Sequence, residues 1–149
     1  MAHATVRGLL GEWTLAENET VLLDMEASIE HLSRGTVRHA DTLVIIVEPY
    51  YRALETAGRI AALAPQLKIP RMIAVGNKIR TPDDEQAVRA YCSTHGLDVA
   101  ALIPFEDRVT AADREGLSFL DIAPDSVMVE QINILADKLS EPLTAARVR

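Results

Sequence analysis

The sequence predicts an α/β domain with a mainly parallel sheet of about four strands and helices on both faces. Short apolar runs alternate along the chain with longer segments whose apolar residues recur at helical spacing, as in βα units. The run Thr42–Val47 is apolar on both faces, which is typical of a central parallel strand. Since 149 residues suit one core, we expect residues 1–149 to form a single α/β domain.

The first elements are predicted from short patterns. Residues 4–17 should form a helix, because their apolar residues recur at helical spacing: Val6, Leu9, Leu10 and Trp13. The apolar run Val21–Leu23 predicts a first strand, and the acidic pair Asp24 and Glu26 follows it. A weaker helical pattern covers residues 29–39.

The central part of the chain has clearer boundaries. A strand over Thr42–Val47 is stopped by Pro49, and the next helix is closed by Pro65; its inward stripe is Leu54, Ala57, Ala61 and Ala64. A third strand is expected over Arg71–Val75, with the sequence Gly-Asn-Lys directly after it.

A well-marked helix follows Thr81, which is expected to be its N-cap. Pro82 stands at the first helical position and Asp84 completes a pattern like a capping box. The buried side of this helix should hold Val88, Tyr91 and Cys92, and His95-Gly96 should end it.

The last predicted strand covers residues 97–103 and is stopped by Pro104. Two helices should follow. One is capped near Asp107 or Thr110, and the other is capped by Asp125, with an inward stripe of Met128, Ile132, Leu135 and Leu139.

Composition excludes several classes of protein. With 15 basic and 22 acidic residues the formal charge is −7, which opposes binding to nucleic acid. No apolar run approaches the roughly 18 residues of a membrane span, and the N-terminus has no secretory apolar region. A single cysteine indicates a reducing compartment. We therefore expect a cytoplasmic protein without a membrane or nucleic-acid partner.

Ligands of parallel sheets bind outside the carboxyl ends of the strands. This rule selects the following edge: Asp24, Glu26, Glu48, Asn77, Lys78 and residues 104–107. A carboxylate such as Asp24 at a strand end suits a Mg²⁺ site, although a helix cap near Ser28 explains it equally well.

The Asn77-Lys78 pair has the form of a loop that recognises a base, because an Asn side chain both donates and accepts. A guanine-specific loop would have a carboxylate where Arg80 stands, so adenine is the better interpretation. The alternative is a polar turn that leads into the Thr81 helix.

Other chemistry-bearing residues favour structural roles. His31 and His39 are eight positions apart and do not share a helix face, so no metal site is predicted. Cys92 falls on the inward stripe of its helix and is expected to be a buried, inert thiol.

Residues 24–36 resemble the switch II segment of the carbon monoxide dehydrogenase accessory ATPases, which support nickel insertion and are related to MinD/ParA ATPases. The resemblance extends to Glu48-Pro49, Asn77-Lys78, residues 103–107 and residues 112–121, and covers most of residues 4–140. It implies a P-loop NTPase fold of three layers. Ser28 and Ser33 stand where the family pattern favours Gly.

The resemblance also implies ATP and Mg²⁺ as cofactors. Asp24 would be the carboxylate near Mg²⁺, and the turn after it would sense the γ-phosphate. The adenine site would consist of Asn77, Lys78, Pro104 and Phe105. The implied client is a metalloenzyme.

A phosphate cradle has the signature G-x-x-x-x-G-K-[ST], and none of the three lysines, Lys68, Lys78 and Lys138, follows a Gly. In the family this loop lies upstream of the switch segment, so we expect the chain to correspond to the later part of the domain, with a truncated fold. Weak or absent ATP binding, and no hydrolysis by this chain alone, are expected. The Cys-x-Cys pair of some family members is also missing.

The family strand that carries the P-loop lies between the strands ending near Asp24 and Glu48. Without it, those strands either pair directly or find a partner in a second copy, so a homo-oligomer, such as a dimer, is expected. Three functions stay open: an ATPase of metallocentre maturation, a non-catalytic self-associating module, and, least favoured, a partition or membrane-site ATPase.

Overall fold

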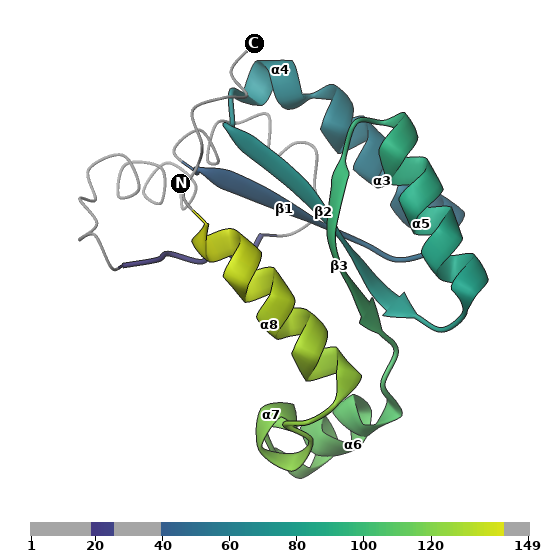
Figure 1. The fold of residues 1–149 in the computed structure, drawn as a ribbon, viewed down its shortest axis with the longest axis vertical. Coiled ribbons are helices and arrows are strands. Elements are labelled where there is room, and N and C mark those ends of the chain that lie inside the picture. The colour runs from purple at the N-terminus through teal and green to yellow at the C-terminus, as the bar shows by residue number, and fades with distance from the viewer. Residues whose placement is uncertain (1–18, 26–39, 142–149) are drawn as a thin grey trace.

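The computed structural model describes residues 19–25 and 40–141, which contain three strands and six helices (Figure 1). The strands are β1 (Thr42–Val47), β2 (Arg71–Ile79) and β3 (Asp98–Pro104). The helices are α3 (Tyr51–Ala62), α4 (Ala64–Leu67), α5 (Pro82–Thr94), α6 (Asp107–Glu115), α7 (Phe119–Ile122) and α8 (Val127–Ser140).

The strands form one parallel sheet in the order β1-β2-β3, and helices cover both of its faces (Figure 1). On one face α3 and α5 bury a cluster that includes Val47, Val88 and Cys92. On the other face Leu135 and Leu139 of α8 pack against a cluster that includes Val75. The predicted three-layer α/β arrangement is therefore confirmed for the described residues.

Helix α5 begins as its sequence predicts. The Thr81 hydroxyl accepts a hydrogen bond from the Asp84 N–H, and the Asp84 side chain accepts from the Thr81 N–H. Pro82 occupies the first turn, where its missing N–H costs nothing. At the other end Gly96 has φ of +68°, the left-handed conformation that Gly adopts without strain.

Helix α8 closes the outer edge of β3. The Gln131 side chain accepts from the Leu102 N–H at 3.3 Å, and the Lys138 ammonium donates to the Ala100 carbonyl. Arg71 of β2 donates to the Lys138 carbonyl at 2.8 Å. Side chains of α8 thus satisfy backbone groups on an edge that would otherwise be open to pairing.

Several predictions of individual elements are wrong. Residues 21–23 are not a strand: they are irregular and exposed, with Leu22 85% accessible, because within the described residues no neighbour pairs with their backbone. The sheet of the described residues accordingly has three strands. Pro65 does not close a helix but lies inside α4, since Pro is tolerated in a first turn.

Helix α8 is capped by Ser126, not by Asp125: the Ser126 hydroxyl accepts from the Val129 N–H. Helix α7 was not predicted, because four residues give no periodicity. The helices predicted over residues 4–17 and 29–39 lie outside the described residues. No helix that the structure describes has the length and apolar character needed to cross a bilayer.

Candidate functional site

The carboxyl ends of the three strands meet at one edge of the sheet, as expected for parallel strands. Glu48 is the first residue after β1. Residues 77–79 are the last of β2 and residue 80 follows it, while residue 104 is the last of β3 and residues 105–106 follow it. The structure therefore brings together the predicted residues Asn77, Lys78, Pro104 and Phe105.

A bulge presents Asn77 and Lys78 at this edge. Gly76 pairs with Leu102 and Ile79 with Pro104, so β2 has two residues where β3 has one. Lys78 takes a left-handed conformation with φ of +57°, and its N–H donates to Asn77 Oδ1 at 3.0 Å. This bond fixes the Asn77 amide, whose NH2 group has no hydrogen-bond acceptor among the residues that the structure describes.

Lys78 is paired with Glu48 across the ends of two strands. The Lys78 Nζ lies 2.6 Å from Glu48 Oε1, and both side chains are partly accessible to solvent. The hydrogen bond and the charge of Glu48 raise the pKa of the Lys78 ammonium. The pair holds the end of β1 against the end of β2.

Arg80 covers the ring of Phe105, with its guanidinium carbon 3.3 Å from the ring centroid. The Phe105 N–H donates to the Ile79 carbonyl at 2.8 Å, and the Arg80 N–H donates to Asp84 Oδ2 at 2.9 Å. A cation over an aromatic face is a favourable contact. The stack therefore holds the segment after β2 against the segment after β3.

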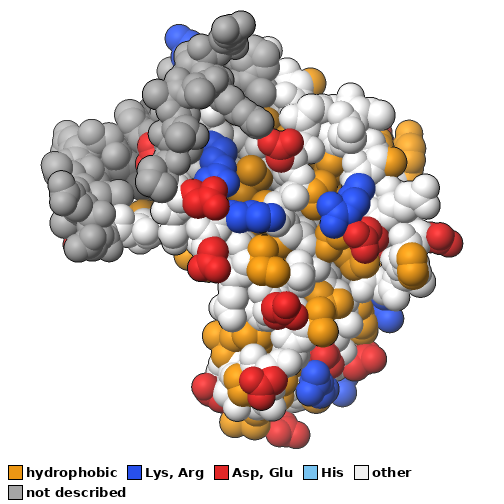
Figure 2. Space-filling view, viewed as in Figure 1, with side chains coloured by type: hydrophobic (Ala, Val, Ile, Leu, Met, Phe, Trp, Pro, Cys, Tyr) orange, Lys and Arg blue, Asp and Glu red, His pale blue; other side chains and the backbone are white. Residues whose placement is uncertain are grey.

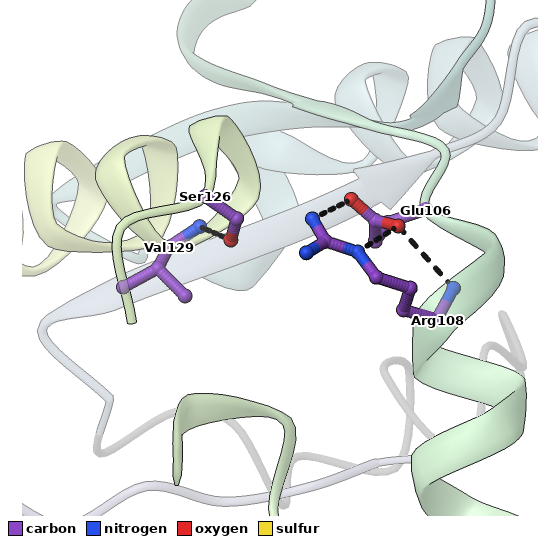
Figure 3. A network of polar contacts seen from close by, with 4 residues as sticks. All are labelled: Glu106, Arg108, Ser126 and Val129. Carbon is purple, nitrogen blue, oxygen red and sulfur yellow. Dashed lines mark hydrogen bonds and ion pairs between the residues drawn. The ribbon is translucent and has the colours of Figure 1, made fainter. Parts of the chain in front are cut away.

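Glu106 caps α6 and is fully engaged by Arg108 (Figure 3). Its carboxylate accepts from the Arg108 backbone N–H at 3.2 Å, from Nε at 2.8 Å and from Nη2 at 2.7 Å. These bonds lower the pKa of Glu106 to about 2. Figure 3 also shows the Ser126 hydroxyl on the Val129 N–H at the start of α8.

Asp24 is not joined to this edge. Its side chain is exposed on the irregular segment 19–25, and within the described residues no hydrogen bond or ion pair links it to Asn77, Lys78 or Phe105. Met25, beside it, packs against the core cluster under α3 and α5. Glu26, Ser28 and the rest of the proposed switch segment lie outside the described residues.

Two contacts at the edge were not predicted from the sequence, namely the Glu48–Lys78 ion pair and the Arg80–Phe105 stack. Opposite charges at the ends of adjacent strands were a signal for the first. No sequence signal identified the second, because it depends on the bulge in β2 and the turn after β3.

The remaining hydrogen-bonding capacity of the edge suits an adenine base. Asn77 can donate from its amide, while Pro104 has no N–H and the Phe105 N–H is already used, so the backbone at this edge offers acceptors. Adenine carries an amino donor beside ring-nitrogen acceptors. Guanine recognition uses a carboxylate acceptor, and two carboxylates at this edge, Glu48 and Glu106, are already paired.

A separate cavity of about 320 Å³ lies at the amino end of β3, lined in part by Arg89, Gly96 and Leu97. It is at the opposite edge of the sheet from Asn77. Since ligand sites of parallel sheets lie at the carboxyl ends, this cavity is not part of the candidate site.

The chain is similar in sequence to known accessory and ATP-binding proteins. The chain is 41% identical over 122 residues to the carbon monoxide dehydrogenase accessory protein CooC of Rhodospirillum rubrum, covering 82% of this chain and 46% of that protein. It is 35% identical over 112 residues to an uncharacterized ATP-binding protein of Methanocaldococcus jannaschii, covering 75% of this chain and 44% of that protein. The chain thus spans about half the length of these curated relatives. No family model matches it.

Solved structures share the fold. MinD of Aquifex aeolicus matches 73% of this chain and 49% of its own with a TM-score of 0.59 and 18% identity. A ParA-family ATPase of Chlorobium tepidum matches 70% of this chain and 43% of its own, with a TM-score of 0.51 and 22% identity.

Proposed function

Since the chain is homologous to the accessory protein CooC and has the fold of MinD and ParA ATPases, we propose that it is the base-binding part of an ATPase for metallocentre maturation. The observation that carries the proposal is the edge of the sheet where a fixed Asn77 amide lies near backbone acceptors. By analogy with CooC, the client would be a metalloenzyme, and nickel would be the metal cargo.

The proposed adenine site consists of Asn77, Lys78, Pro104 and Phe105, with Arg80 completing it by its stack on Phe105. Asp24 is proposed as the carboxylate near Mg²⁺; its exposed side chain is available for such a contact. The ion, when bound, would offset the charge of the ATP phosphates. Among the described residues no group of three or more His, Cys, Asp or Glu side chains is arranged for a metal.

We further propose that these 149 residues bind ATP weakly and do not hydrolyse it alone. Phosphoryl transfer depends on a loop of converging N–H groups with a Lys, and no Gly-Lys pair occurs in the sequence. A calorimetric titration with millimolar ATP, with and without Mg²⁺, tests this point. We expect weak or absent binding and no turnover; tight Mg²⁺-dependent binding or turnover would contradict it.

A second candidate function is a self-associating, non-catalytic module, and the edge of β1, which no strand of the described residues covers, favours it. In the described sheet β1 has one neighbour, β2, whereas α8 covers the outer edge of β3. Ile46, on the same face of β1 as Val44, is 56% exposed, so this strand also presents an apolar side chain to a partner. Sedimentation velocity across a range of concentrations should show a dimer that Ile46→Lys weakens; a monomer at all concentrations would exclude this candidate.

A further inference from the structure

The end of the molecule formed by α6, α7 and the first turn of α8 carries an exposed apolar surface, which we call the α6–α8 lobe (residues 107–130). Figure 1 shows α6 and α7 at the amino end of α8, beyond the sheet. Ten large apolar side chains are exposed in the described part of the chain, and four of them lie within eleven residues in this lobe: Leu117, Leu120, Ile122 and Val127.

These four side chains are exposed because the elements that carry them turn other residues inward. Ala112 of α6, Ala123 after α7 and Val129 of α8 are buried, at 2%, 6% and 6% accessibility. Leu120 and Val127 remain 54% and 63% exposed. A group of apolar side chains left in water beside a formed core is a mark of an interaction surface.

The lobe is also strongly acidic. Residues 107–130 contain six Asp or Glu and two Arg. One of these two, Arg108, forms an ion pair with Glu106, which lies just before the lobe. The lobe carboxylates are Asp107, Asp113, Glu115, Asp121, Asp125 and Glu130. Figure 2 shows orange apolar side chains and red carboxylates interspersed in this part of the molecule, together with some blue side chains.

The negative charge of the α6–α8 lobe distinguishes between two possible binding partners, a second copy of this chain and a basic protein. A second copy of this chain would bring the same negative lobe, and like charges facing each other at an interface oppose association. A partner with Lys and Arg around an apolar stripe would pair with the rim while its stripe covered Leu120 and Val127. A partner helix whose apolar residues recur at i, i+3 and i+4 presents such a stripe along one face.

We propose that the α6–α8 lobe is a docking surface for a basic amphipathic helix of a partner protein. The exposed apolar side chains supply contact area that leaves water on binding, and the carboxylates that alternate with them along the chain steer the partner and set its orientation. This surface is separate from Asn77 and Phe105, so the proposal stands whether or not a nucleotide binds.

The test uses the full 149-residue chain and two synthetic 18-residue helical peptides as probes. One peptide has a Leu stripe with Lys on its polar face, and the other has the same stripe with Glu. In two-dimensional ¹H–¹⁵N NMR titrations the Leu/Lys peptide should shift signals of residues 107–130. Equal binding of the Leu/Glu peptide, or shifts confined to residues 77–106, would overturn the proposal.

Matched variants separate the two parts of the surface. Leu120→Ser with Val127→Ser should weaken the Leu/Lys peptide by about ten-fold, and Asp121→Asn with Asp125→Asn should weaken it by about three-fold and reduce its dependence on salt. Leu22→Ser removes an even more exposed apolar side chain outside the lobe and should change nothing. If the Leu22 variant loses as much binding as the lobe variants, or if neither lobe variant differs from the unmodified chain, the proposal fails.

Discussion

The Lys78 ammonium lies 2.6 Å from the Glu48 carboxylate, so one ion pair joins the carboxyl ends of β2 and β1. Lys78 is held in a left-handed conformation by the bulge that also presents Asn77. The pair, the bulge and the Arg80–Phe105 stack together shape the edge at which we propose that adenine binds.

Removing the Glu48 charge should lower the pKa of Lys78. Glu48 raises that pKa above its ordinary value of 10.5, so the pair stabilises the fold below pH 10.5 and this contribution is lost as pH rises through the raised pKa. With only three lysines, ¹³C-dimethylated protein can be titrated by NMR. A Lys78 midpoint that is the same in Glu48→Gln as in the unmodified protein would contradict the pairing.

The carboxylate of Glu106 should stay ionised in acid down to a pH of about 2, because Arg108 donates three hydrogen bonds to it. Its pKa is lower in the folded chain than its ordinary value of 4.5, so its contribution to stability is present above pH 4.5 and is lost as pH falls through about 2. Carboxyl ¹³C NMR measures the midpoint. Arg108→Ala should move it toward 4.5, and an unchanged midpoint in that variant would show that Arg108 is not the cause of the low pKa.

Replacing the helix cap of α8 should destabilise the fold, and the neighbouring carboxylate is its control. Ser126→Ala removes the acceptor for the Val129 N–H and should lower the free energy of unfolding by about 0.5–2 kcal/mol. Asp125→Ala should change it by no more than about 0.5 kcal/mol. Urea denaturation measures both variants, and the opposite order of effects would make Asp125 the cap.

A Cβ at Gly76 would lie 2.5 Å from Leu102 Cδ2, so the Leu102 side chain would have to shift to admit it. Gly76→Ala should therefore lower the free energy of unfolding by about 1–3 kcal/mol. Leu102→Val removes the clashing methyl, so the double variant should cost less than the sum of the single variants by about 0.5–3 kcal/mol. Strictly additive losses in urea denaturation would show that the contact does not limit this position.

The elements that the sequence predicted correctly carry two agreeing signals. Helix α5 combined a Thr81 cap with a Pro82 start and an inward stripe, and β1 combined apolar character on both faces with a Pro49 stop. Val21–Leu23 had apolar character alone, and a strand needs a paired neighbour that three residues cannot reveal.

The cap of α8 was misplaced by one residue because Asp and Ser are both good N-caps, and backbone geometry chose Ser126. Residues at the candidate edge were found because strand ends are readable approximately, although β2 runs on to Ile79 and not to the predicted end at Val75. The contacts of these residues were not predicted, because the bulge in β2 sets where Lys78 and Arg80 point.

Recognition of an adenine base by Asn77 and its neighbours can be tested without the phosphates, by comparing adenosine with guanosine. In ¹H–¹⁵N NMR titrations of the 149-residue chain, adenosine at millimolar concentration should shift signals of residues 76–80 and 104–106. Guanosine should bind at least about ten-fold more weakly, and Asn77→Ala should abolish the adenosine shifts. No shift with adenosine, or equal shifts with guanosine, would contradict adenine recognition at this edge of the sheet.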